Sequence, residues 1–162
     1  VLGLSKSYGE AFYKAQEATQ TKLPLDGTVL ISVSNRDKPE VVEVAQDFVR
    51  AGFKIIASKH TCELLHANNI EAEKINKLQE GRPNMLDLIT NEKIDIIVNT
   101  PSGKESKNDD SYLRKAAIKK KVPYVTTMAA AKAAVKGILT VKEHGSSEVK
   151  SLQELHSEIK HK

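Results

Sequence analysis

Polar side chains stand at the predicted carboxyl ends of five short apolar runs. In chain order they are Ser32 and Ser34, Ser58, Asn76 and Lys77, Asn99 and Thr100, and Thr126 and Thr127. Hydroxyl, amide and ammonium groups donate hydrogen bonds to anions. Because ligands of open parallel sheets bind beyond the carboxyl ends of the strands, this set predicts a pocket that suits a phosphate group.

Two predicted helices start beside these strand ends. Lys38, followed by Pro39, opens the first helix, and Thr61 lies at the start of the second. The free N–H groups of a helix N-terminus favour an anion, so both positions fit the phosphate pocket. The competing interpretation is that the Ser and Thr residues are N-caps, which contribute about 1 kcal/mol each and need no ligand. The residues alone leave both interpretations open.

Patterns that would indicate catalysis or metal binding are weak. The five histidines show no metal-ligand spacing, and neither common nucleotide-binding glycine motif is present. Cys62 lies alone in a predicted helix and is interpreted as a small core residue. Asp109 and Asp110 have two interpretations, as caps of a helix or as acids and bases. The Ser-Gly-Lys sequence within 99–110 either binds phosphate or lies in a solvated loop. We therefore expect no catalytic residue and no metal site.

The elements that must position these residues alternate along the chain. Apolar runs predict strands at 28–34, 53–58, 70–76, 94–99 and 123–127. Amphipathic periodicity predicts helices at 39–52, 61–69, 84–91, 110–121 and 128–137. Five strands, each followed by a helix, predict an α/β fold with a five-stranded parallel sheet flanked by helices on both faces.

Both ends of the chain are assigned to segments outside this α/β domain at 27–145. An apolar stripe predicts a helix over 7–18, formed by Tyr8, Ala11, Phe12 and Ala15. We assign residues 1–26 to a helix and linker at the junction with a preceding domain. Residues 146–162 are predicted to be a helical tail that packs on the domain through Val149, Leu152, Leu155 and Ile159.

Composition excludes several classes of function. The formal charge is +4, but 21 acidic residues are mixed with 25 basic ones, which argues against a nucleic-acid partner. No apolar run approaches the roughly 18 residues that a membrane-spanning helix needs. A single cysteine excludes an internal disulfide and fits a reducing cytoplasm, where we expect the protein to be located.

Three segments carry a resemblance to a known family. They are GTVLISVSNRDKPEVVEVAQDFVRAGFKIIAS at 27–58, INKLQEGRPNMLDLITNEKIDIIVNTPSGK at 75–104 and VPYVTTMAAAKAAV at 122–135. These segments resemble the C-terminal regulatory domain of carbamoyl-phosphate synthase large subunits, and the resemblance extends over nearly the whole chain. Its most specific part is the N-K-x-x-E-G-R-P pattern at 76–83.

The resemblance implies a methylglyoxal-synthase-like α/β fold and an allosteric nucleotide monophosphate, UMP or IMP. The residues it implies as the effector shell are Ser32, Lys38, Ser58, Thr61, Lys77 and Asn99, with Asp109 or Asp110 near the ribose. Tyr124 and Thr126 match positions that face an ornithine site in some relatives. The domain itself would need no cofactor, while the parent ligase would use ATP and Mg. The implied protein partners are the synthetase domains of the same subunit and, through them, the glutaminase small subunit.

Two departures from the family pattern affect the effector site. His60 replaces a glycine after the second strand, and Pro101 stands where relatives often have a hydroxyl. The effector therefore stays open among UMP, IMP, ornithine, acetylglutamate and none. The alternative function is a methylglyoxal synthase-type lyase acting on dihydroxyacetone phosphate. The segment 80–84 reads Glu-Gly-Arg-Pro-Asn and lacks the catalytic aspartate of that enzyme, and the Lys-Thr-Leu-His-Pro motif of the related cyclohydrolase domain is also missing.

Overall fold

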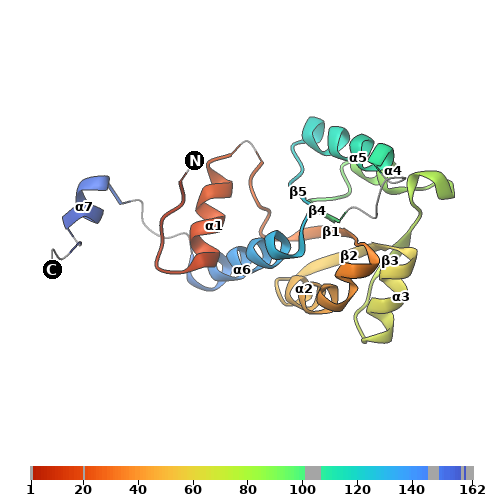
Figure 1. Ribbon diagram of the computed structural model, residues 1–162, viewed down its shortest axis with the longest axis horizontal. Helices are drawn as coiled ribbons and strands as arrows, with labels where there is room; N and C mark the ends of the chain where they lie inside the picture. Colours follow the sequence, from red (N-terminus) through yellow and green to blue (C-terminus); the bar gives the residue numbers. More distant parts are fainter. Residues whose placement is uncertain (1, 20, 101–106, 146–149, 158, 160–162) are drawn as a thin grey trace.

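A computed structural model describes residues 2–19, 21–100, 107–145, 150–157 and 159 (Figure 1). The strands are β1 Gly27–Ser32, β2 Phe53–Ser58, β3 Glu73–Ile75, β4 Ile96–Asn99 and β5 Tyr124–Val125. They form one five-stranded parallel sheet in the order β3-β2-β1-β4-β5. The predicted fold class and all five predicted strands are confirmed, although β3 and β5 are shorter than predicted.

Helices cover both faces of the sheet. They are α1 Tyr8–Glu17, α2 Lys38–Arg50, α3 Lys59–Ala67, α4 Met85–Thr90, α5 Lys107–Lys120, α6 Met128–His144 and α7 Leu152–Ser157, with short 3-10 helices at Asn35–Asp37 and Leu78–Glu80. Side chains of α2, α3 and α6 share one hydrophobic cluster with the sheet, and those of α4 and α5 share a second one. The sheet therefore separates two apolar layers, as its near-continuous apolar strands predict.

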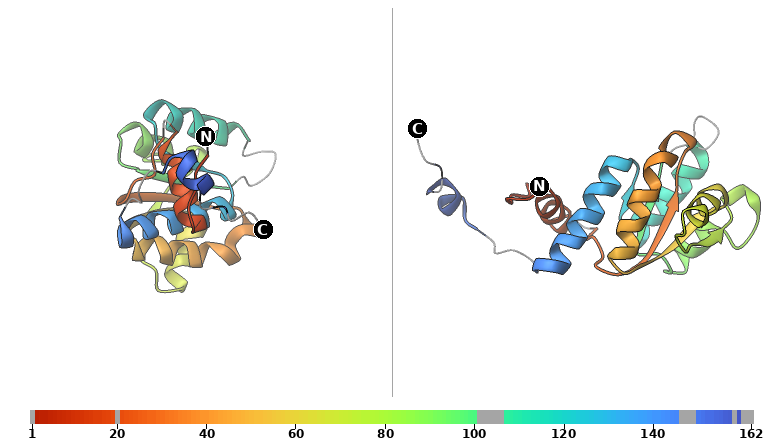
Figure 2. Two further views of the ribbon diagram at one scale, coloured as in Figure 1. Left: turned by 90° about the vertical axis from the view of Figure 1, so that its left-hand side faces the viewer. Right: turned by 90° about the horizontal axis from the view of Figure 1, so that it is seen from below.

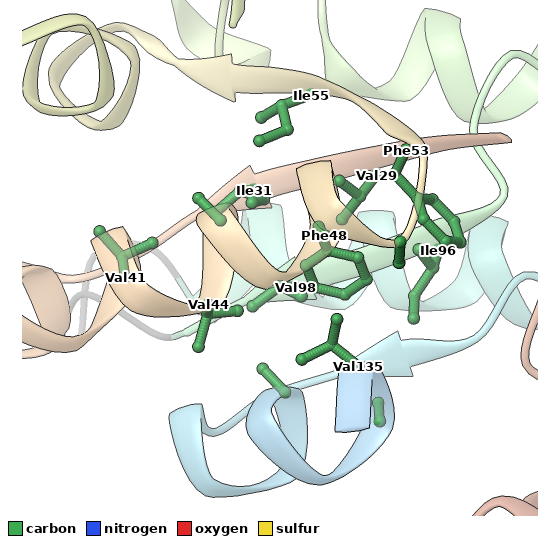
Figure 3. Close-up of a cluster of buried hydrophobic side chains, with 14 of the residues drawn as sticks. Val29, Ile31, Val41, Val44, Phe48, Phe53, Ile55, Ile96, Val98 and Val135 are labelled. Carbon is green, nitrogen blue, oxygen red and sulfur yellow. The ribbon is translucent and has the colours of Figure 1, made fainter. Parts of the chain in front are cut away.

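The side chains of β1 alternate between these layers. Val29 and Ile31 pack with Phe48 of α2 and Val135 of α6, all fully buried (Figure 3). Leu30 lies between them in the chain and packs in the other layer, with α4 and α5. Because successive strand residues face opposite sides, Ser32 falls on the face of α4 and α5. This alternation decides which polar side chains meet at the end of the strand.

Helix α1 packs against another helix of the same chain. Its buried residues are Gly9 and Tyr13, and it lies against α6 (Figures 1 and 2). A side-chain carbon added at Gly9 would come within 3.1 Å of the Lys136 backbone, so the two helices approach each other closely. Helix α6 thus covers part of the apolar stripe of α1, whereas Tyr8 of that stripe is 71% exposed, and the assignment of residues 1–26 to a domain junction stays a prediction.

The tail contains the predicted short helix, α7. None of the residues of α7 is buried, Leu152 is 74% exposed, and the helix lies apart from the sheet in Figure 1 and in the right-hand view of Figure 2. The described residues thus do not show the predicted packing of the tail on the domain. Val149, one of the residues assigned to that contact, lies outside the described residues.

Candidate functional site

The strand order reverses between β1 and β4, and the predicted site lies at the carboxyl ends of these two strands. From β1 the chain builds outward to β2 and β3, and it then returns to place β4 on the opposite side of β1. Ser32 and Asn99 are register partners at the ends of β1 and β4, and both are 6% exposed. Such a reversal leaves a crevice beyond the strand ends, where ligands of open α/β sheets bind.

The hydroxyl group of Thr61 joins the end of β2 to the end of β1. Thr61 Oγ1 accepts a hydrogen bond from Ser58 Oγ at 3.2 Å and lies 3.5 Å from the Val33 backbone nitrogen. Ser58 is the residue before α3, but its side chain makes no capping bond. The capping interpretation is therefore wrong for Ser58, and the Thr61 hydroxyl keeps its own proton for a further acceptor.

Thr127 behaves as the capping interpretation predicts. Its hydroxyl accepts a hydrogen bond from the Ala130 backbone nitrogen at 3.2 Å, at the start of α6. Thr126, which the resemblance places on an ornithine side, is half-buried and makes no side-chain hydrogen bond within the described part of the chain. Neither hydroxyl contributes to the network at β1 and β2.

Asp37 is a site residue that the sequence analysis missed. Its carboxylate accepts a hydrogen bond from Ser34 Oγ at 2.7 Å, and bonds from the Ser34 and Thr100 hydroxyls lower its pKa. Thr100 Oγ1 also accepts from the Ser34 backbone nitrogen at 2.8 Å, so the carboxylate ties the turn after β1 to the end of β4. The Ser-x-x-Asp spacing from 34 to 37, which resembles a capping box, is the signal that points to this contact.

Lys38 and Lys77 are half-buried and have no ion-pair partner among the residues that the structure describes. Lys38 is the first residue of α2, and Lys77 immediately precedes the 3-10 helix at Leu78–Glu80. The contrast is Lys132, whose ammonium group lies within 3.0 Å of both Glu40 and Glu43. A partly desolvated ammonium without a carboxylate is a natural anion-binding group.

Asn99 holds a polar cluster at the ends of β4 and β5. Its Nδ2 donates to Asp110 Oδ1 at 2.8 Å and to Tyr124 Oη at 2.6 Å. Burial raises the pKa of Tyr124, and the Arg114 guanidinium lies 5.7 Å from the centre of its ring. Of the two aspartates predicted near the ribose, Asp109 and Asp110, the structure places Asp110 next to Asn99.

Asp109 points elsewhere, because its carboxylate accepts a hydrogen bond from Gln79 Nε2 at 3.0 Å. His60, which replaces a glycine of the family pattern, has a side chain that is 72% exposed and pairs with Glu63 at 3.3 Å. Pro101, the other departure, and the Ser-Gly-Lys segment lie outside the described residues. Of the two features that the structure describes, Asp109 contacts Gln79 of the 3-10 helix after Lys77, whereas His60 contacts a residue of its own helix.

The other reactive groups among the described residues are separate from this site. Within the described ranges, no three His, Cys, Asp or Glu side chains are grouped to hold a metal ion. Cys62 is buried, its Sγ donates to the Ala72 carbonyl oxygen at 3.3 Å, and burial raises its pKa. It is a core thiol, as predicted. None of the described helices has the length and apolar character to cross a membrane.

Comparisons with known proteins agree with this architecture. Residues 40–126 match the family model of the MGS-like domain. A crystal structure of methylglyoxal synthase from Elizabethkingia anophelis NUHP1 superposes with a TM-score of 0.56 at 17% identity, covering 70% of this chain and 79% of that one. A crystal structure of ForH gives a TM-score of 0.53 at 18% identity, covering 75% and 83%. At these identities the two structures show a shared fold.

Curated relatives share much more sequence. The C-terminal section of the carbamoyl phosphate synthase large chain from Methanopyrus kandleri is 46% identical over 157 residues, which is 96% of this chain and 29% of the relative. The carbamoyl phosphate synthase large chain from Archaeoglobus fulgidus is 45% identical over 159 residues, or 98% of this chain and 15% of the relative. The chain thus spans less than a third of either relative. It belongs to the MGS-like domain family and is similar, over almost all of its length, to part of the carbamoyl phosphate synthase large chain.

Proposed function

We propose that this domain is the allosteric regulatory part of a carbamoyl phosphate synthase large chain and binds a nucleoside monophosphate, UMP or IMP. The observation that carries the proposal is the pair of half-buried lysines, Lys38 and Lys77, which have no acidic partner in the described part of the chain. Both flank strand ends that belong to the same edge of the sheet. An anion at this edge would neutralise them.

The neighbouring hydroxyl groups support a phosphate as this anion. Thr61 Oγ1 already accepts a hydrogen bond from Ser58, so its proton is available to a phosphate oxygen. Ser32 Oγ has no partner among the residues described here, and the residue is only 6% exposed. Ammonium and hydroxyl donors around one point match the acceptor-only surface of a phosphate monoester.

The activity that this domain would regulate lies outside the chain. The parent ligase would make carbamoyl phosphate from bicarbonate, an ammonia source and ATP with Mg, for pyrimidine and arginine biosynthesis. The domain would need no cofactor of its own, and its partners would be the synthetase domains and, through them, the glutaminase small subunit. A nucleotide bound here controls synthesis only if it has a different affinity for two states of the parent enzyme.

The direct test is thermal unfolding of the 162-residue chain with and without UMP and IMP. At about 100 times the dissociation constant, a ligand that binds only the folded state adds about 2.7 kcal/mol. For a domain of this size we expect the melting temperature to rise by about 5–10 °C. Unchanged melting with both nucleotides at millimolar concentration would contradict the proposal.

Variants of the two lysines test where the phosphate binds. Lys38→Ala and Lys77→Ala should each weaken UMP binding by about 1.5–3 kcal/mol, the contribution of a hydrogen bond to a charged group. The double variant should lose less than the sum, because both lysines contact one charge. Lys115→Ala is the control, since Lys115 is exposed on α5. If both single variants bind UMP as the parent does, the phosphate does not lie between them.

A further inference from the structure

We propose that Asp37 is a positioning residue of the phosphate site. Its carboxylate holds the turn between β1 and α2 in one conformation and thereby fixes the place from which Lys38 reaches the phosphate. The inference rests on the proposed function, because it explains how one binding residue for the same ligand is held. It assigns a role to a residue that is not in the predicted effector shell.

The turn after β1 is bonded to segments that follow both neighbouring strands. On one side the Ser34 backbone nitrogen donates to Thr100 Oγ1 at 2.8 Å, directly after β4. On the other side the Val33 backbone nitrogen lies 3.5 Å from Thr61 Oγ1, in the helix that follows β2. The residues before Asp37 therefore have a fixed path between the two strand ends.

Asp37 closes this turn. Its backbone nitrogen donates to the Ser34 carbonyl oxygen at 3.1 Å, and its carboxylate accepts from Ser34 Oγ at 2.7 Å. The Thr100 hydroxyl also bonds to the carboxylate, and the bonds from both hydroxyls lower the pKa of Asp37. Lys38 is the next residue and the first of α2, so the direction in which its side chain leaves the backbone depends on this turn.

Two other roles for the carboxylate do not fit its contacts. Asp37 is in the N-cap position of α2, but its side chain makes no capping bond. Its contact with Arg36 is 3.4 Å long and the Arg36 side chain is 78% exposed, so this ion pair contributes little. The Asp37 side chain is only 15% exposed, and the hydroxyl groups of the turn and of β4 are its hydrogen-bond partners. The carboxylate therefore stabilises the turn rather than the helix end or the surface.

The carboxylate of Asp37 cannot bind the phosphate itself. An ionised carboxylate accepts hydrogen bonds and has none to donate, and two negative charges repel each other. Asp37 can therefore favour a phosphate only through a neighbouring group, and Lys38 is the adjacent cation in the chain. Two opposite effects follow. The charge of Asp37 weakens phosphate binding, whereas its hydrogen bonds strengthen binding because they hold Lys38.

Calorimetric titration of the 162-residue chain with UMP separates these two effects. Asp37→Ala removes the hydrogen bonds, and we expect it to weaken UMP binding about five- to tenfold, within the range for one lost hydrogen bond. Asp37→Asn removes the charge but keeps a group that can accept from Ser34 and donate to Thr100, so it should bind UMP at least as tightly as the parent. In a Lys38→Ala background, Asp37→Ala should change the affinity by less than about twofold, because the residue through which it acts is gone.

Asp47→Ala is the matched control and should leave UMP binding unchanged. Asp47 is an aspartate of α2 itself, its side chain is 17% exposed, and it pairs with Arg50 at 3.2 Å. If Asp37→Ala fails to fold, Thr100→Val decides, because it removes the acceptor of the Ser34 nitrogen and one donor to Asp37. This variant must also weaken UMP binding, and unchanged binding would overturn the inference.

Three further outcomes would reject the positioning role and leave the proposed function intact. They are equal or tighter UMP binding by Asp37→Ala, an equal loss in Asp37→Asn and Asp37→Ala, and an undiminished effect of Asp37→Ala when Lys38 is absent. A carboxylate that only stabilises the fold would give unchanged affinity, and one that acts only by its charge would give tighter binding. Absence of UMP binding by the parent would reject the proposed function together with the inference.

Discussion

The ionised carboxylate of Asp37 connects the residues that follow β1 to the residue that follows β4. Its carboxylate accepts hydrogen bonds from the hydroxyls of Ser34 and Thr100, residues that follow β1 and β4. These bonds hold its pKa below the usual value of 3.8. The folded protein therefore binds a proton at this carboxylate less readily than the unfolded chain does, which makes folding stability depend on pH.

Asp37 should make the domain less stable in acid. Because the folded pKa is depressed, the contribution of the carboxylate is complete above the unfolded pKa and is lost as pH falls through the folded pKa. Urea unfolding at pH 6, 4 and 3 should show a smaller loss of stability in Asp37→Asn than in the parent. Asp26→Asn serves as the control, since Asp26 is exposed. Parallel losses in the parent and in Asp37→Asn would contradict this assignment.

Thr61 combines a structural contact with a proposed ligand contact. Thr61→Ala should cost about 1–3 kcal/mol, because it removes the acceptor near the buried Val33 N–H group. It should also weaken UMP binding, whereas Thr61→Ser keeps the hydroxyl and should retain most of both. Chemical unfolding and titration of the two variants check this. A Thr61→Ala protein that unfolds earlier but binds like the parent would restrict the hydroxyl to structure.

At the scale of elements, two glycines set the contact between α1 and α6. Gly137 is buried within α6, and a side-chain carbon there would lie 2.7 Å from the Gly9 carbonyl oxygen and 3.1 Å from Tyr13 Cβ. Gly137 does not end helix α6, which was predicted to stop at this residue and instead continues to His144. The glycine costs helix propensity but permits the close approach of α1.

Gly137→Ala should destabilise the domain although alanine is the better helix former. The gain of about 1 kcal/mol in propensity is opposed by an overpacking cost of about 1–3 kcal/mol, because backbone atoms of α1 cannot move aside as a flexible side chain would. The control is Lys136→Ala, a change at the exposed position beside it that should stay within about 0.5 kcal/mol. A higher melting temperature for Gly137→Ala would show that α1 is not held against α6.

At the scale of the whole molecule, the shared fold raises the question of whether the domain is an enzyme. Proton abstraction next to a carbonyl needs a base within hydrogen-bond reach of the substrate. The 80–84 loop offers only Glu80, whose carboxylate accepts from the Lys77 backbone nitrogen at 2.9 Å. The carboxylates nearer the strand ends, Asp37 and Asp110, bind Ser34 and Asn99.

The purified chain should therefore form no methylglyoxal from dihydroxyacetone phosphate. A colorimetric assay of the product, with a methylglyoxal synthase as positive control and heat-denatured protein as blank, measures this. Turnover above the blank that disappears on heating would replace the regulatory proposal with a lyase. Binding of dihydroxyacetone phosphate without turnover would fit the regulatory proposal, since the phosphate donors are the same.

The sequence by itself determined the fold class and the set of strand ends. The spacing of apolar residues is a local property of the sequence, and a sheet buried on both faces requires apolar strands and amphipathic helices. The alternation of five strands and five helices could therefore be predicted, with element ends correct to within a few residues in most cases. The parallel sheet then follows from the connections, and with it the edge where Ser32, Ser58 and Asn99 meet. Lys38 and Lys77 could also be proposed in this way, because Lys38 directly precedes a predicted helix and Lys77 directly follows a predicted strand.

Only the tertiary structure decided which partner each polar group has. The Ser34 nitrogen and Thr100 are 66 residues apart in sequence, and Asn99 and Tyr124 are 25 apart, so their bonds depend on strand register and rotamer. For the same reason the sequence could not show that Asp110, and not Asp109, contacts Asn99. It also could not show that the Thr61 hydroxyl bonds to Ser58 whereas the Thr127 hydroxyl caps a helix. The same holds for helix α1, because an apolar stripe predicts that one face of a helix is buried but does not predict which element packs against that face.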